Sequence, residues 1–309
     1  MSEIPKRPFG NTGFDATTLG YGAMEVRGSG PYAPELTDAE SDRLLNSVLD
    51  AGINFIDTSI CYGRSEELIG KYLARRREEY FLASKCGCVV GAIGMHEHVH
   101  TAANIRQGVE NSLRLLKTDH LDLLQFHRSL TQQEYEAEGA LQEALKIKEE
   151  GKTRFLGVSA TLPHMVEHIG MGCFDAFQVP YSALQRDHEA VIHKASEAGA
   201  GIIIRGGAAR GTPEDWDNRW YYMLDKDTLQ HRWDTAGLDE LLDGMSRIEF
   251  TIRFTLSNPD LDTTIIGTAN LQHLQDNVDY AVKGPLPADL VAEAKRRLTA
   301  AGSAPDGEE

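Results

Sequence analysis

Four polar side chains that suit proton transfer lie at or shortly after the ends of apolar segments in this 309-residue chain. Three of them close such a segment, and the tyrosine comes five residues after the aspartate. A phenol can deliver a proton, an ammonium can stabilise the phenolate that is left, a carboxylate can hold the ammonium, and an imidazole can orient a carbonyl oxygen. Together they could pass a proton to or from an oxygen atom of a substrate. The four residues are Asp57, Tyr62, Lys85 and His127.

The apolar segments that position these residues alternate with amphipathic helical patterns along the chain. Segments this short and apolar are typical of buried parallel strands. A charged group is costly inside such a strand and is better placed at its C-terminal end, which is the active-site face of α/β barrels. We expect strands over residues 17–20, 53–56, 80–83, 121–125, 154–158, 176–179, 201–204 and 263–266. We expect helices over residues 38–50, 65–77, 102–116, 133–150, 162–169, 187–198, 238–257, 271–282 and 287–298.

Eight strand–helix pairs predict a parallel sheet that closes on itself, that is, a single-domain (β/α)8 TIM barrel. A β-hairpin over residues 7–14, with its turn at 11–13, is expected to cap the barrel before its first strand. A long polar loop follows the seventh strand, and the tail over 303–309 is expected to be loose. No segment has the composition of a linker, so one domain is predicted over residues 1–309.

The composition limits the classes of partner. Hydrophobic residues make up 41% of the chain and charged residues 25%, which is typical of a folded globular protein. A formal net charge of −16 disfavours binding to nucleic acid or to anionic membranes. The apolar segments are much shorter than the ~20 residues of a membrane span, and the N-terminus lacks the apolar core of a signal peptide. We therefore expect a cytoplasmic protein whose partner is a small molecule; the sequence does not indicate an oligomeric state.

Residues 53–70 resemble the signature of the aldo-keto reductases, and so do residues 83–87, 121–127 and 155–159. The resemblance extends from about residue 7 to residue 298, with the motifs in the family's order. It implies a barrel that binds an extended nicotinamide dinucleotide without a Rossmann domain, and the chain has no glycine-rich strand–helix fingerprint. The implied activity is the NAD(P)H-dependent interconversion of an aldehyde or ketone and its alcohol.

Asp57, Tyr62, Lys85 and His127 correspond by position to the family's catalytic tetrad. The resemblance implies that Tyr62 is the acid/base, that Lys85 stabilises the tyrosinate, that Asp57 anchors the ammonium and that His127 orients the carbonyl oxygen.

The resemblance also implies a set of cofactor contacts. Ser159 and Gln178 match residues that bind the nicotinamide carboxamide, although Ala160 stands where the family usually has asparagine. Arg205 takes the place of a ring that often stacks on the nicotinamide. Relatives often bind the 2′-phosphate of NADPH with lysine and arginine. For this chain we expect NADPH as the cofactor, with NADH as the alternative. The expected contacts are Gly22, Ala23, Ser159, Gln178, Arg205, Gly206, Ala208, Arg210, Gly267, Thr268, Asn270, His273 and Asn277.

The sequence leaves two other functions open. One is a non-catalytic subunit that binds nicotinamide cofactors. The other is a metal-dependent barrel hydrolase that would use the loop histidines His96, His98 and His100. This loop does not follow a strand end directly, so we expect no metal. The aromatic residues of the insertion over 213–233, with Met24 and Cys61, are expected to wall the substrate pocket.

Overall fold

A computed structural model describes residues 3–28, 36–90, 98–208, 212–213 and 224–306. Eight parallel strands form a closed barrel in the order β10-β3-β4-β5-β6-β7-β8-β9. Each expected strand overlaps one of them, so the predicted TIM barrel is confirmed. The strands are β3 (Leu19–Gly22), β4 (Phe55–Asp57), β5 (Phe81–Cys86), β6 (Leu121–Phe126), β7 (Thr153–Ser159), β8 (Ala176–Pro180), β9 (Gly201–Arg205) and β10 (Thr263–Ile266).

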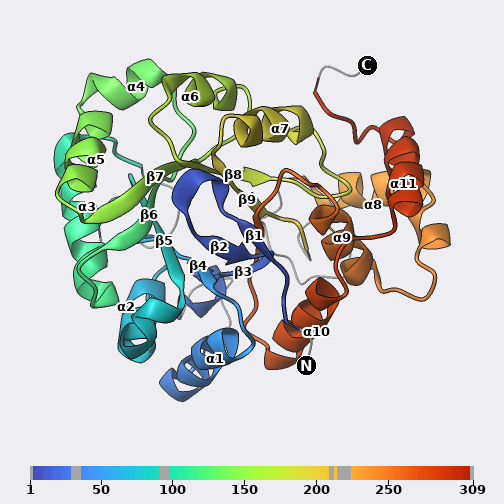
Figure 1. Cartoon of the computed structure of the whole chain (residues 1–309), viewed down its shortest axis with the longest axis horizontal. Coiled ribbons are helices and arrows are strands. Elements are labelled where there is room, and N and C mark those ends of the chain that lie inside the picture. The colour runs from blue at the N-terminus through green and yellow to red at the C-terminus, as the bar shows by residue number, and fades with distance from the viewer. Residues whose placement is uncertain (1–2, 29–35, 91–97, 209–211, 214–223, 307–309) are drawn as a thin grey trace.

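Helices surround the barrel on the outside, as Figure 1 shows. Their apolar faces pack on the outward side chains of the strands and form the main hydrophobic core. The α-helices are α1 (Asp38–Asp50), α2 (Ser65–Tyr72), α3 (Ala102–Leu116), α4 (Gln132–Ala137), α5 (Ala140–Glu149), α6 (Met165–Met171), α7 (Glu189–Glu197), α8 (Lys226–Thr235), α9 (Arg247–Leu256), α10 (Leu271–Val282) and α11 (Ala288–Ala300). Short 3-10 helices are η1 (Gly10–Thr12), η2 (Ala23–Val26), η3 (Ala74–Glu79) and η5 (Leu238–Leu241).

The predicted hairpin closes one end of the barrel. Strands β1 (Lys6–Pro8) and β2 (Asp15–Thr17) pair antiparallel and lie across the centre of the ring in Figure 1. Between them Phe9 is fully buried, with its ring 5.3 Å from the rings of Phe55 and Phe81. A Cβ at Gly201 would meet the Phe9 ring at 2.6 Å, so glycine is required there. Side chains therefore fill the interior of the barrel at this end.

Several expected helices have different limits in the structure. The expected helix over 133–150 is broken into α4 and α5 at Gly139, whose φ of 72° lies in the left-handed region. The expected helix over 238–257 begins as α9 at Arg247, because Ser246 Oγ accepts a hydrogen bond from the Glu249 amide at 3.1 Å. Helix α8 lies in the segment expected to be a polar insertion, and Asp225 caps its N-terminus.

Contacts with the rest of the protein extend further into the C-terminal tail than expected. Ser303 is fully buried, and its Oγ donates a hydrogen bond to the Ala183 carbonyl oxygen at 2.9 Å. Arg186 also donates to the Ser303 carbonyl oxygen at 3.1 Å. Within the described ranges, no helix is both long and apolar enough to cross a membrane.

The strand register brings the polar residues of the tetrad to one edge of the barrel. Gly22 pairs with Asp57, Lys85 pairs with Gln125, and Ser159 pairs with Gln178. Parallel strands expose their C-terminal ends on the same face, so these side chains meet at the end of the barrel opposite the hairpin.

Candidate active site

A cleft of about 450 Å³ lies over the C-terminal ends of the strands. Its volume suits a small-molecule ligand. Three members of the expected tetrad line it, and the fourth, Lys85, lies beneath them. The lining residues are Gly22, Met24, Glu25, Asp57, Tyr62, His98, His127, Arg128, Ser129, Ser159, Thr161, Gln178, Arg205, Gly206, Ala208, Ile265, Ile266, Gly267 and Asn277.

Lys85 and Asp57 form a buried ion pair at the floor of the cleft. The Lys85 ammonium donates hydrogen bonds to Asp57 Oδ1 and, at 2.9 Å, to the Thr58 carbonyl oxygen. The Lys85 side chain has no exposed surface and that of Asp57 only 2%. Charges at this depth persist only when they are paired and hydrogen-bonded, and both conditions are met here.

Two glutamine side chains complete the environment of Asp57. Gln125 Nε2 and Gln178 Nε2 each donate a hydrogen bond to Asp57 Oδ2 at 2.8 Å. The sequence analysis missed Gln125. A signal for it existed, because it lies two residues before His127 and alternate residues of a strand face the same side.

Tyr62 lies over this ion pair and faces the cleft. The Lys85 ammonium is 5.0 Å from the centroid of the Tyr62 ring, and the His127 ring is 5.7 Å from it in an edge-to-face arrangement. A tight turn holds the tyrosine, with its amide donating to the Ser59 carbonyl oxygen at 3.0 Å. The next residue, Gly63, has a φ of +50°, and a Cβ there would meet the Arg27 carbonyl oxygen at 2.4 Å. The structure therefore brings Asp57, Tyr62, Lys85 and His127 together.

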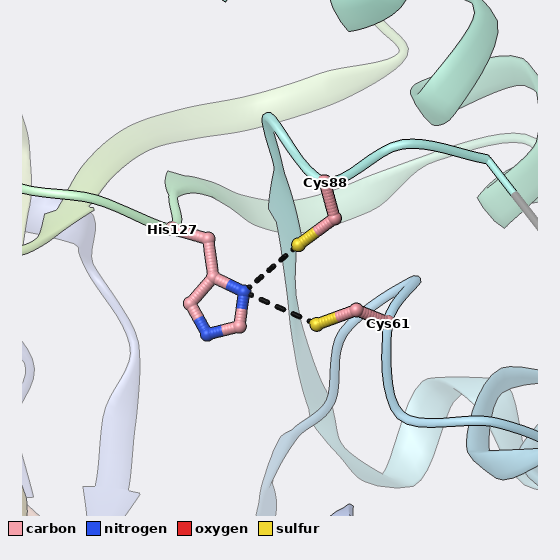
Figure 2. Close-up of side chains that lie close together, drawn as sticks. All are labelled: Cys61, Cys88 and His127. Atoms are coloured by element: carbon pink, nitrogen blue, oxygen red, sulfur yellow. Dashed lines mark hydrogen bonds between the residues drawn. The ribbon is translucent and has the colours of Figure 1, made fainter. Parts of the chain in front are cut away.

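His127 contacts a group of small polar side chains through one ring nitrogen. Its Nδ1 lies 3.1 Å from Cys88 Sγ, 3.4 Å from Cys61 Sγ and 3.3 Å from Ser59 Oγ. Figure 2 shows the other nitrogen, Nε2, pointing away from both sulfurs. When Nδ1 accepts a hydrogen bond from one of these groups, the ring proton is on Nε2, where it can be donated to a ligand.

The thiols of this group differ in their acidity. A hydrogen bond from Cys88 lowers the pKa of Cys61 below its ordinary value, and His127 acts in the same direction against the effect of burial. The shared proton raises the pKa of Cys88. Close by in the core, burial raises the pKa of Glu66 to about 7, while a 2.6 Å hydrogen bond from Ser84 opposes the shift.

The expected cofactor residues divide into two sets. Most line the cleft: Gly22, Ser159, Gln178, Arg205, Gly206, Ala208, Gly267 and Asn277. Among the others, Ala23 and Thr268 are buried, and Thr268 accepts a hydrogen bond from the Asn270 amide at 3.0 Å. Asn270 caps α10, with its Oδ1 accepting from the Gln272 and His273 amides. Arg210 lies outside the described residues.

The carboxamide subsite expected at the ends of β7 and β8 is partly occupied by contacts within the protein. Gln178 uses its amide nitrogen on Asp57, and its Oε1 accepts a 3.4 Å hydrogen bond from Ser159. A carbonyl oxygen has two lone pairs, so Gln178 Oε1 can still accept a hydrogen bond from a ligand amide.

The expected aromatic wall and the histidine loop can be placed only in part. Trp233 is fully buried in α8, where its Nε1 donates to Asp239 at 2.8 Å. Contrary to the prediction, it does not line the cleft. The other aromatic residues of the insertion lie outside the described residues: Trp216, Trp220, Tyr221 and Tyr222.

His96 also lies outside the described residues, but its two neighbours in the histidine loop are placed. His98 lines the cleft, with its ring 5.4 Å from that of His127. Burial lowers the pKa of His100 to about 4, so this ring is neutral at neutral pH.

Comparisons with known proteins agree with the geometry. Residues 18–297 match the aldo/keto reductase family, and the chain belongs to that family. It is 25% identical to the uncharacterized oxidoreductase YqkF of Bacillus subtilis over 89% of this chain and 90% of that protein. It is 27% identical to L-galactose dehydrogenase of Arabidopsis thaliana, over 90% of this chain and 88% of that protein. The holo form of an aldo-keto reductase from Bacillus halodurans superposes with a TM-score of 0.80 at 25% identity, covering 96% of each chain.

The family and the fold together define an NAD(P)H-dependent oxidoreductase of carbonyl compounds. Neither the non-catalytic subunit nor the metal-dependent hydrolase is favoured by these matches.

Proposed function

We propose that Tyr62 is the proton donor in carbonyl reduction and the acceptor in alcohol oxidation. The observation that carries the proposal is the buried Lys85–Asp57 pair under the Tyr62 ring. A cation held at this place stabilises the tyrosinate that forms when Tyr62 gives up its proton. A nicotinamide cofactor, when bound, supplies the hydride, because no side chain can do so.

His127 completes the arrangement on the other side of the carbonyl oxygen. Its Nε2 is free of the sulfur contacts that Nδ1 makes, and His127 lines the cleft beside Tyr62. An Nε2–H group would donate a hydrogen bond to the carbonyl oxygen and orient it toward the phenol.

The cleft residues fit the cofactor at both ends. Ser159 and Gln178 Oε1 would bind the carboxamide, and Arg205 would lie against the nicotinamide ring. At the other end, α10 has no acidic residue in its first turn, so the positive end of its dipole suits a phosphate group, which would compete with Asn270 Oδ1 for the Gln272 and His273 amides. Gly267 and Asn277 line the cleft at this end.

We further propose a modest preference for NADPH over NADH, carried by Arg210 and His273. His273 is exposed in the first turn of α10, where an imidazolium would attract the 2′-phosphate. The preference should therefore weaken with salt. Dissociation constants for both cofactors in the wild type, Arg210→Ala and His273→Ala test it; tighter NADH binding by the wild type would contradict it.

A hydroxyl-rich carbonyl compound is the substrate class that the cleft supports best. Polar groups of Arg128, Ser129 and Thr161 line the part of the cleft near His127, with Met24 as an apolar contact. Similarity to a dehydrogenase of L-galactose supports the same class. Measured kcat/KM values for sugar aldehydes and for alkyl aldehydes of equal size would decide between a polar and an apolar preference.

The central experiment is Tyr62→Phe, which removes one oxygen atom and leaves the ring. We expect carbonyl reduction to fall by several orders of magnitude, while the dissociation constant of the cofactor stays within a few-fold of the wild-type value. Tyr72→Phe on α2 is the matched control and should keep its activity. Near-normal turnover by Tyr62→Phe would refute the assignment of the acid.

A further inference from the structure

Cys61, Cys88 and His127 come from three separate loops and meet at one point beside the cleft (Figure 2). They follow β4, β5 and β6, which are neighbours in the barrel. In the described part of the chain, this is the one group of at least three histidine, cysteine, aspartate or glutamate residues whose ligand atoms all lie within 4.8 Å of one another. Both cysteines are buried, with 3% and 1% exposure, and both are free thiols.

A fourth polar atom, Ser59 Oγ, closes the group. It lies 3.2 Å from Cys61 Sγ, 4.0 Å from Cys88 Sγ and 3.3 Å from His127 Nδ1. The ring nitrogen in turn is 3.4 Å and 3.1 Å from the two sulfurs. Five of the six distances among the two sulfurs, the nitrogen and the oxygen thus lie between 3.1 and 4.0 Å, and the sulfurs lie within 4.8 Å of each other, so the four atoms form an irregular tetrahedron.

The size of this tetrahedron matches a metal ion. A regular tetrahedron with edges of about 3.4 Å has its centre about 2.1 Å from each corner, and Zn²⁺ binds nitrogen at about 2.0–2.1 Å and sulfur at about 2.3 Å. The sulfurs need to move outward by only a few tenths of an ångström. Hydrogen bonds already hold the four atoms together, so little ordering is needed for binding.

We propose that Cys61, Cys88 and His127 Nδ1 bind a thiophilic divalent ion of the Zn²⁺ class, with Ser59 Oγ or a water molecule as the fourth ligand. Two cysteines and one histidine are a ligand set that holds zinc. Binding releases the two thiol protons to the solvent, and the resulting thiolates neutralise the charge of the ion, which makes it compatible with a buried site. From the sequence we expected no metal and weighed only the loop histidines, whereas this site uses the histidine of the tetrad.

Binding at this place leaves the cleft side of His127 open. An ion on Nδ1 requires the ring proton to be on Nε2, which is the nitrogen that points away from the sulfurs. The ion would thus hold the imidazole in the form that donates to a carbonyl oxygen. Metal binding at this site can be measured without measuring hydride transfer.

The experiment is a titration of the reduced full-length chain with Co²⁺, which gives visible ligand-field bands when tetrahedral and thiolate-bound. We expect one equivalent of Co²⁺ to produce these bands and Zn²⁺ to abolish them by displacement. Cys61→Ser and Cys88→Ser should each lose the bands. Cys173→Ser is the control and should keep them, because this half-buried cysteine does not belong to the group.

Folding of the variants is checked by circular dichroism, and alanine replaces serine where a variant does not fold. In the unaltered chain, Zn²⁺ should also raise the unfolding midpoint, and a chelator should reverse the change. Absence of tetrahedral bands in the unaltered chain overturns the proposal. Bands of equal intensity in both cysteine variants also overturn it, because the ion would then be bound elsewhere.

Discussion

Replacing Lys85 by methionine removes the charge under Tyr62 and keeps most of the side-chain volume. Asp57 then remains as a buried carboxylate that accepts, among the described residues, from the amides of Gln125 and Gln178. The variant should lose activity and stability for two separable reasons: the phenolate loses its cation, and the carboxylate loses its partner.

The effect on the rate follows from the distance. With the ring centroid as the position of the phenolate charge, 5.0 Å from Lys85 Nζ, an effective dielectric constant of about 20 gives about 3 kcal/mol. That corresponds to about two orders of magnitude in the rate of carbonyl reduction. Breaking a buried ion pair costs about 3–5 kcal/mol, and we expect the lower end because two donors to Asp57 remain.

The double variant Lys85→Met/Asp57→Asn separates the two effects. An asparagine oxygen can still accept from Gln125 and Gln178, and no charge is left unpaired. Unfolding by urea should therefore show that most of the lost stability returns, while steady-state reduction at saturating cofactor stays at the level of the single variant. If activity returned together with stability, the ion pair would be a structural element only and the reasoning about Tyr62 would be wrong.

Three further predictions concern stability. Burial raises the pKa of Glu66 to about 7, so the folded state holds a proton that the unfolded chain releases near the ordinary glutamate pKa of 4.5. The stability from this group is fully present below pH 4.5, and up to about 3 kcal/mol is lost as the pH rises through 7. Urea unfolding at pH 5 and pH 8 should show this loss in the wild type and a smaller one in Glu66→Gln. Thr37→Ala removes a capping box at α1 and should cost about 1 kcal/mol by the same assay, with no change in kcat. Phe9→Ala empties the closed end of the barrel and should cost about 3–5 kcal/mol; a loss below 1 kcal/mol would mean that the hairpin is not a structural plug.

The barrel and the tetrad were predictable from local pattern. Short apolar segments that end in Asp57, Lys85 and His127 define both the strands and the edge at which these side chains meet. Every residue of β6 is buried, so it is the alternation of side chains along the strand that turns Gln125 and His127 to the same side as Leu123 of the inner cluster. Element limits were less predictable, because a single glycine with positive φ, Gly139, divides a pattern that is otherwise continuous.

Contacts between distant segments were not predictable in the same way. Cys61 and Cys88 are far apart in sequence, and their approach depends on the register of β4, β5 and β6 and on the loops that follow. The role of Asn270 as a helix cap competes with its expected role as a cofactor contact, and only the observed backbone shows that its Oδ1 is already occupied. Sequence spacing specifies which strand end a residue follows, but not which neighbours its side chain selects.

The two amides that bind Asp57 come from two strands at different distances around the ring. Gln125 belongs to β6, while Gln178 belongs to β8, which stands across the barrel from β4 in the closed order of strands. The bond from Gln178 to Asp57 therefore spans the ring, and the set of hydrogen bonds to Asp57 is complete only when the ring is closed. Two half-barrels, one with β3 to β6 and the other with β7 to β10, would each be inert. Recovery of turnover on mixing the two halves would then show that the sheet had closed and that Gln178 had reached Asp57 on the strand opposite.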